Sequence, residues 1–240
     1  MNNLQFHEML KESFLRYLEV GSRSSKKLLN LHGAISWDLC ARLNSDGQSN
    51  YQVESLGFGS GSEVQVKGRY GYKKIDITVT RNGNPIAGIA VKYVMSNYSQ
   101  NSNNYFENML GETANIRCVD IPYFQIFALP DKIPYFRKDG SIKKWETITA
   151  NNLEKYIELS KEDFSVNMHV PNKMLVAVVS FASNEGGGFL QPQTKSDYIN
   201  YYQSEEFSVV PSELKFAFGD AVIYNDYERF MGEVARAIHG

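Results

Sequence analysis

The sequence has few cysteines and no long apolar run. Among its 240 residues there are two cysteines, Cys40 and Cys118. No stretch reaches the length of a membrane-spanning helix or has the form of a signal peptide. We therefore expect a cytoplasmic chain whose thiols are reduced.

Histidine is also scarce, and its positions exclude the common structural zinc sites. The four histidines are scattered along the chain, at His7, His32, His169 and His239. No cysteine and histidine spacing matches a zinc site. His32 lies among leucines and an isoleucine at helical spacing, so we expect a packed helix histidine rather than a catalytic base.

Neither sign of charge is in excess. The net charge is −2, with 22% of the residues charged and 42% hydrophobic, which excludes a uniformly basic nucleic-acid coat. The length suits one domain with a substantial core. Locally, six basic residues lie in sequence around Asp76, a pattern that favours a phosphate-binding cleft: Lys67, Arg69, Lys73, Lys74, Arg81 and Lys92.

The middle of the chain reads as a hairpin followed by a helix. Alternating apolar and polar residues predict a half-buried strand over 74–80, with Asp76 on its polar face. The turn-forming sequence Asn82-Gly83-Asn84 follows. A second strand is predicted over 86–95, and apolar residues at helical spacing predict a helix over 105–117.

The length of the turn decides whether the side chains of Asp76 and Lys92 meet. A two-residue loop sends them to opposite faces of the hairpin. A three-residue loop pairs Arg81 with Pro85 instead. Asp76 then lies directly opposite Ala90, on the face of Lys92, and we expect this arrangement.

This arrangement resembles the core of the PD-(D/E)xK nuclease superfamily, which includes most type II restriction endonucleases. That core has an aspartate on one hairpin strand, a second strand that ends in x-x-Lys, and then a helix. Asp76 and Lys92 match it. Ile75 stands where the proline would be, and Ala90 stands where the second carboxylate would be.

Some restriction enzymes that recognise CCGG share the second departure. They have a small residue, valine and lysine, and a glutamate that has migrated to the following helix. Here Ala90-Val91-Lys92 is followed by Glu107, with fourteen residues between the lysine and the glutamate. The resemblance thus assigns the third site residue to Glu107, with Glu112 as the alternative on the same helix. Glutamates of the N-terminal helix are a further alternative, at Glu8, Glu12 and Glu19.

The resemblance implies a Mg²⁺ ion bound by Asp76, Glu107 and a backbone carbonyl near Val91. Phosphodiester hydrolysis develops negative charge on the attacking water, the non-bridging oxygens and the leaving oxygen. Carboxylates that hold Mg²⁺ beside the phosphate stabilise this charge. Lys92 would polarise the water or the phosphate.

The other segments predict an α/β, restriction-endonuclease-like fold, with a mixed central β-sheet flanked by helices. Apolar runs over 123–129 and 174–181 predict buried strands beside the hairpin, with the helix that carries Glu107 as the crossover. We expect one nuclease domain over 1–240, made of N-terminal helices (1–44), the catalytic core (51–129), and a sheet extension with a C-terminal helix (130–240).

A polar run over 96–104 follows the second strand. Asparagine and glutamine can donate and accept together at the adenine edge in the major groove. We expect DNA contacts from this run and from two basic residues before it, at Asn97, Gln100, Asn101, Asn104, Lys73 and Lys74. The alternative is an asparagine-rich loop that caps the next helix.

The expected function is that of a Mg²⁺-dependent type II restriction endonuclease acting on double-stranded DNA. Symmetric cleavage of both strands needs two sites, so a homodimer is expected. One alternative is another DNA nuclease on the same core, in repair or phage defence. The other is a catalytically inactive DNA-binding or protein-binding module, which Ala90 favours.

Overall fold

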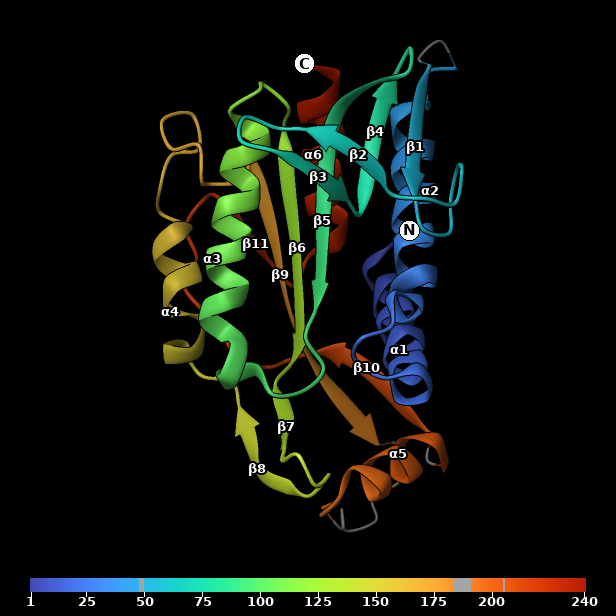
Figure 1. Cartoon of the computed structure of the whole chain (residues 1–240), viewed down its shortest axis with the longest axis vertical. Coiled ribbons are helices and arrows are strands. Elements are labelled where there is room, and N and C mark those ends of the chain that lie inside the picture. Colours follow the sequence, from blue (N-terminus) through green and yellow to red (C-terminus); the bar gives the residue numbers. More distant parts are fainter. Residues whose placement is uncertain (48–49, 184–190, 205) are drawn as a thin grey trace.

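The computed structural model describes residues 1–47, 50–183, 191–204 and 206–240. Its elements form a central sheet with helices on both faces (Figure 1). The predicted α/β class with a mixed, helix-flanked sheet is therefore confirmed. In the described part of the chain, no helix combines the length and the apolar character that crossing a bilayer requires.

The central sheet has seven strands in the order β1-β4-β5-β6-β9-β10, and β11 also pairs with β9. Strands β5, β6 and β9 run parallel, and the pairs β1–β4, β4–β5 and β9–β10 are antiparallel. The bounds are β1 Tyr51–Ser55, β4 Ile77–Arg81, β5 Asn84–Tyr93, β6 Tyr123–Pro130, β9 Lys173–Ser183, β10 Phe207–Pro211 and β11 Val222–Tyr224. The two buried strands predicted beside the hairpin are thus confirmed as β6 and β9.

Helices cover both faces of this sheet (Figure 1). One core cluster packs α1, α2 and α6 against the sheet, and a second packs α3 and α4 against the other face. Residues Ile89, Val91 and Tyr93 of β5 belong to the first cluster, whereas Val94 belongs to the second. The helices are α1 Asn3–Val20, α2 Leu29–Leu43, α3 Tyr98–Arg117, α4 Ala150–Leu159, α5 Lys195–Ser204 and α6 Tyr227–His239, with a 3-10 turn η1 at Ser25–Leu28.

The first strand of the predicted hairpin is divided at Asp76. Before it, β3 (Tyr72–Ile75) pairs with β2 (Val64–Lys67) in a separate two-stranded ribbon. After it, β4 joins the central sheet. Asp76 therefore lies at the point where the chain leaves the ribbon and enters the sheet, and its backbone belongs to neither strand.

The turn between β4 and β5 has two residues, so the predicted three-residue loop is wrong. Arg81 pairs with Asn84 across the turn. The two turn residues, Asn82 and Gly83, both have positive φ, which is the conformation that the tightest hairpin turns require. Taken alone, this turn would place Asp76 and Lys92 on opposite faces.

A β-bulge reverses that consequence. The pairing slips by one residue between Val79 and Thr80, so Ile86 is an extra residue in β5. A slip of one residue moves all later side chains of a strand to the other face. Asp76 consequently lies opposite Ala90 across the strand pair. The sequence predicted this position from a three-residue loop, whereas the bulge is what produces it.

Helix α3 begins at Tyr98, well before the predicted start at residue 105. The preceding Asn97 has a left-handed backbone and makes no side-chain cap. The first turn is satisfied from elsewhere, because the backbone N–H of Ser99 donates to Glu146 over 3.1 Å and its hydroxyl donates to the same carboxylate. Glu146 lies on β8 (Ile142–Thr147), which pairs with β7 (Lys132–Phe136).

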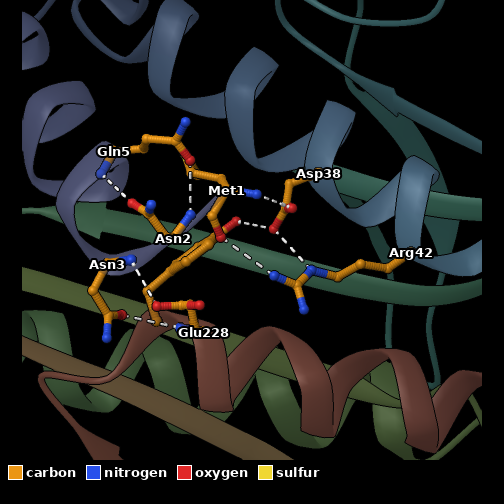
Figure 2. Close-up of polar contacts among 8 residues, drawn as sticks. Met1, Asn2, Asn3, Gln5, Asp38, Arg42 and Glu228 are labelled. Carbon is orange, nitrogen blue, oxygen red and sulfur yellow. Dashed lines mark hydrogen bonds and ion pairs between the residues drawn. The ribbon is translucent and has the colours of Figure 1, made fainter.

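A buried carboxylate joins three helices near Met1 (Figure 2). Asp38 on α2 is 4% exposed and accepts hydrogen bonds from Arg42 Nε and Tyr227 Oη, each over 3.0 Å. It also pairs with the Met1 amine. At the edge of the same group, Asn3 N donates to Glu228 over 3.2 Å. Asp38 thus links α2 to α6 and to the start of α1.

Replacing Asp38 by alanine should lower the free energy of unfolding by about 3 kcal/mol, because the buried partners lose their common acceptor. Urea denaturation measures this change. Glu228→Ala is the control, since Glu228 is exposed and its loss should change the stability by less than about 0.5 kcal/mol. Equal stability of Asp38→Ala and the wild type would contradict the buried network.

Candidate functional site

Asp76 is held in place by the strand opposite it. Its Oδ2 accepts a hydrogen bond from Val91 N over 2.7 Å. Burial raises the pKa of Asp76 to about 6, against the opposing effects of the Val91 hydrogen bond and of the nearby Lys73 and Lys92, while Glu112 adds to the rise. Asp76 is therefore a carboxylate whose charge is poorly solvated, and a cation beside it would stabilise it.

Lys92 lies on the same side as Asp76. Its Nζ is 4.4 Å from the centre of the Tyr105 ring on α3, a cation–π contact. Burial lowers the pKa of Lys92, while Asp76 and Glu112 raise it. Lys27 is close enough that burial and the charge of Lys92 together lower its pKa. The ammonium of Lys92 thus lies near Asp76 and near a second ammonium group, that of Lys27.

Glu112 reaches the same place from α3. It forms an ion pair with Lys73 of β3, and both side chains are half-buried. The ribbon β2–β3 is fixed to this helix, because Arg69 N donates to the backbone oxygen of Asn115 over 2.8 Å and Tyr70 N donates to its side-chain oxygen over 2.8 Å. The ribbon therefore positions Lys73 against Glu112.

These groups surround a cavity of about 240 Å³ between β5, β6 and α3. Its polar lining comprises Lys73, Asp76, Lys92, Tyr105, Asn108, Glu112, Gln125 and Tyr156. Gln125 lies on β6 directly beside Ala90, and its Nε2 donates to Thr113 over 3.3 Å. An amide side chain thus adjoins the position where Ala90 supplies no carboxylate. Two carboxylates and an ammonium can together bind a divalent cation and a phosphate.

Glu107 does not belong to this lining, contrary to the sequence-based assignment. It is exposed and lines a neighbouring surface hollow with Tyr70, Asn108 and Glu112. Glu107 lies near Lys155 of α4: burial lowers the pKa of Lys155, and the charge of Glu107 raises it. Five residues along a helix correspond to about 140° of rotation, so Glu107 and Glu112 leave α3 in different directions, and only Glu112 also reaches the cavity. The alternative, Glu112, is the glutamate at the cavity.

The other predicted metal ligands are the backbone at Val91 and, as alternatives, the three N-terminal glutamates. Val91 lines the cavity, and its backbone N–H is bound to Asp76. None of the three N-terminal glutamates lines it. Glu12 accepts a hydrogen bond from Asn30 over 3.2 Å, and Glu19 pairs with Arg16.

The polar run is mostly the first part of α3 rather than a loop. The amide of Asn97 is occupied, because it donates to Phe136 O over 3.0 Å and accepts from Phe136 N over 3.1 Å. The amide of Asn97 is therefore engaged within the fold rather than turned toward a base. Gln100 and Asn104 are exposed and four residues apart, so they share one face of the helix. Asn101 is half-buried between them and bonds to Tyr105.

The two lysines predicted to contact DNA, Lys73 and Lys74, lie in different surroundings. Lys73 is engaged with Glu112 inside the site, whereas Lys74 is exposed on the ribbon. The strict alternation of β3 explains this difference, because neighbouring residues of a strand point to opposite faces.

Sequence reasoning missed a second group of residues beside Asp76. The side chains of His32 on α2, Glu63 before β2, and Asp76 bring one nitrogen and two oxygen atoms within 4.8 Å of one another. His32 is 2% exposed, as the packed-histidine prediction requires. Among the described residues, however, neither of its ring nitrogens has a hydrogen-bond partner. Burial lowers the pKa of His32 to about 4 and keeps the ring neutral, against the charge of Glu63.

Comparisons with known proteins do not assign this site. No family model matches the chain, and no curated protein matches it. A similar solved structure is the crystal structure of a protein of unknown function, AF1548, with 14% sequence identity and a TM-score of 0.23. The match covers 45% of this chain and 50% of that chain, so about half of AF1548 is spanned.

Proposed function

We propose that this chain is a metal-dependent nuclease that hydrolyses phosphodiester bonds in double-stranded DNA. The observation that carries the proposal is the convergence of Asp76, Glu112 and Lys92 on one cavity. These residues come from three separate segments, and the bulge in β5 is what gives Asp76 and Lys92 a common face. The proposal keeps the PD-(D/E)xK resemblance but assigns the third site residue to Glu112 instead of Glu107.

Each of these residues has a role in the proposed reaction. Asp76, aligned by Val91 N, and Glu112 would hold Mg²⁺, and Gln125 adds an amide oxygen to the same wall. The ion, when bound, supplies charge stabilisation and lowers the pKa of a bound water. Lys92 would bind a non-bridging oxygen of the phosphate. Lys73 neutralises Glu112 in the absence of the ion.

The ribbon β2–β3 supports nucleic acid as the substrate. It carries exposed basic and aromatic side chains next to the cavity, the combination that binds phosphates and stacks on bases. Tyr70 is 83% exposed and Tyr72 is 66% exposed. The exposed basic residues of the ribbon and its turn are Lys67, Arg69 and Lys74.

Incubation of the purified protein with a plasmid and Mg²⁺ tests the proposal. It also distinguishes a restriction endonuclease from a nuclease without sequence preference. Discrete fragments would identify a type II restriction endonuclease, for which we also propose a homodimer with one site per DNA strand. A smear would identify a nuclease without sequence preference. Binding of DNA without cleavage would favour the inactive binding module, which the alanine at position 90 supports.

We propose that the exposed face at the start of α3 recognises the base sequence of the DNA. Gln100→Ala and Asn104→Ala should each weaken binding to a specific site by about 1–3 kcal/mol, the worth of a bidentate contact to adenine. Binding to random DNA should stay nearly unchanged, as measured by titration of labelled duplexes. Asn103→Ala is the control, since its side chain is bonded to Lys155. Equal losses on both DNAs would instead indicate backbone contacts.

A further inference from the structure

The group formed by His32, Glu63 and Asp76 has the composition of a metal site. Its three side chains come from α2, from the segment before β2 and from the junction of β3 and β4. Their ligand atoms lie within 4.8 Å of one another. Ligand atoms that are each about 2.1 Å from one ion lie about 3–4 Å apart, so a small side-chain adjustment completes the site.

The two free nitrogens of His32 give an independent reason to expect a ligand. Buried polar atoms are nearly always hydrogen-bonded. Within the described residues, His32 is buried and neither Nδ1 nor Nε2 is paired. A packing role explains the burial of the ring but leaves both nitrogens unsatisfied. A bound metal would give one of these nitrogens a partner. The ring is already neutral, as a metal ligand must be.

The ligand set indicates the class of metal. One imidazole and two carboxylates carry a charge of −2, which a divalent cation balances. Mg²⁺ prefers oxygen ligands and keeps most of its waters, whereas imidazole favours first-row transition metals such as Co²⁺ and Zn²⁺. A site that includes His32 therefore discriminates against Mg²⁺ more strongly than Asp76 and Glu112 alone.

We propose that His32, Glu63 and Asp76 bind one divalent transition-metal ion in preference to Mg²⁺. Asp76 also lines the cavity with Glu112 and Lys92, so this ion adjoins the proposed nuclease site. The inference extends the proposed function by naming a metal class and two ligands. Its test needs no DNA, and it can therefore fail or hold separately from the nuclease activity.

Calorimetric titration of the full chain with Co²⁺ and with Mg²⁺ tests the proposal, and the visible absorption of bound Co²⁺ reports nitrogen and oxygen ligands. We expect one Co²⁺ per chain, which a hundredfold excess of Mg²⁺ does not displace. His32→Gln and Glu63→Gln should weaken Co²⁺ binding by more than about tenfold. Because glutamine keeps a neutral polar side chain at position 32, His32→Gln should leave the weak Mg²⁺ binding unchanged.

His7→Ala is the matched control, since His7 is also a buried helix histidine but lies on α1, outside the group. Circular dichroism verifies the fold of each variant. The proposal is overturned if the wild type binds no Co²⁺, or if His32→Gln binds it as tightly as His7→Ala does. A crystal structure grown with Co²⁺ that places only a water on His32 would overturn it as well.

Discussion

Replacing Asp76 by asparagine should reduce DNA cleavage by at least about a thousandfold while leaving the chain folded. A carboxylate that holds a metal beside the scissile phosphate contributes several kcal/mol of charge stabilisation, which corresponds to this loss in rate. Asparagine can still accept the hydrogen bond from Val91 N, which Asp76 accepts over 2.7 Å. Single-turnover cleavage of a labelled duplex measures the loss.

The same variant should be more stable than the wild type at high pH. Burial raises the pKa of Asp76 to about 6 in the folded chain, above its value of about 4 in an unfolded chain. Wild-type stability therefore falls as the pH rises from about 4 to about 6, because the folded state binds the proton more tightly. Asparagine does not titrate, so the variant gains above pH 6 and the difference vanishes below pH 4.

Urea denaturation at pH 4 and pH 8, with a chelator present, measures this difference. Lys74→Ala is a suitable control, since Lys74 is exposed on the neighbouring ribbon. A variant Asp76→Asn that is less stable than the wild type at pH 8 would contradict the burial of a charged Asp76. Loss of activity together with a gain in stability is the pattern expected of a functional carboxylate.

Glu112→Gln should reduce cleavage about a hundredfold or more, whereas Glu107→Gln should leave it within about twofold. The reason is the geometry of α3, since only Glu112 lines the cavity with Asp76 and Lys92. Glu107 is exposed toward solvent and α4. The two variants remove the same group from one helix, so each is the other's control.

Binding measurements separate a metal-binding role of Glu112 from a structural one. Glu112→Gln releases Lys73 from its ion pair, so the affinity for DNA should stay constant or rise while cleavage falls. A parallel fall in affinity and cleavage would indicate that the site has collapsed. Full activity of Glu112→Gln with an inactive Glu107→Gln would restore the original assignment.

The elements of the fold could be predicted because their signals are local. The apolar run of β6 follows directly from burial on both faces of the sheet. The alternation of β4 predicted a strand but the wrong burial, because Thr78 and Thr80 are buried together with the apolar residues. The start of α3 could not be predicted in this way. Its first turn is satisfied by Glu146 on β8, a contact with a residue far along the sequence.

The common face of Asp76 and Lys92 was predicted correctly, but for the wrong reason. Asp76 and Lys92 were expected on one face through a three-residue loop, but the loop has two residues and the bulge at Ile86 compensates. Asparagine and glycine signal a tight turn, whereas a bulge leaves no comparable signature in the sequence. The polar Gln125 inside an apolar strand was a visible signal that went unused.

His32 shows the limit of interpreting a residue by its neighbours in sequence. The surrounding leucines correctly indicated burial. They carried no information on Glu63 and Asp76, which approach His32 through the tertiary fold. A buried histidine becomes a candidate ligand only when the partners of its nitrogens are known.

The most direct test of the nuclease assignment compares the wild type with Lys92→Ala on supercoiled plasmid, with Mg²⁺, with Co²⁺ and with a chelator. In the proposed reaction Lys92 would bind the phosphate, and its exposed side chain contributes little to folding. We predict that the wild type converts the plasmid to cut forms with a metal and not with the chelator, and that Lys92→Ala leaves it supercoiled throughout. An inert wild type at a molar excess over the DNA, or equal cutting by both proteins, would contradict the assignment.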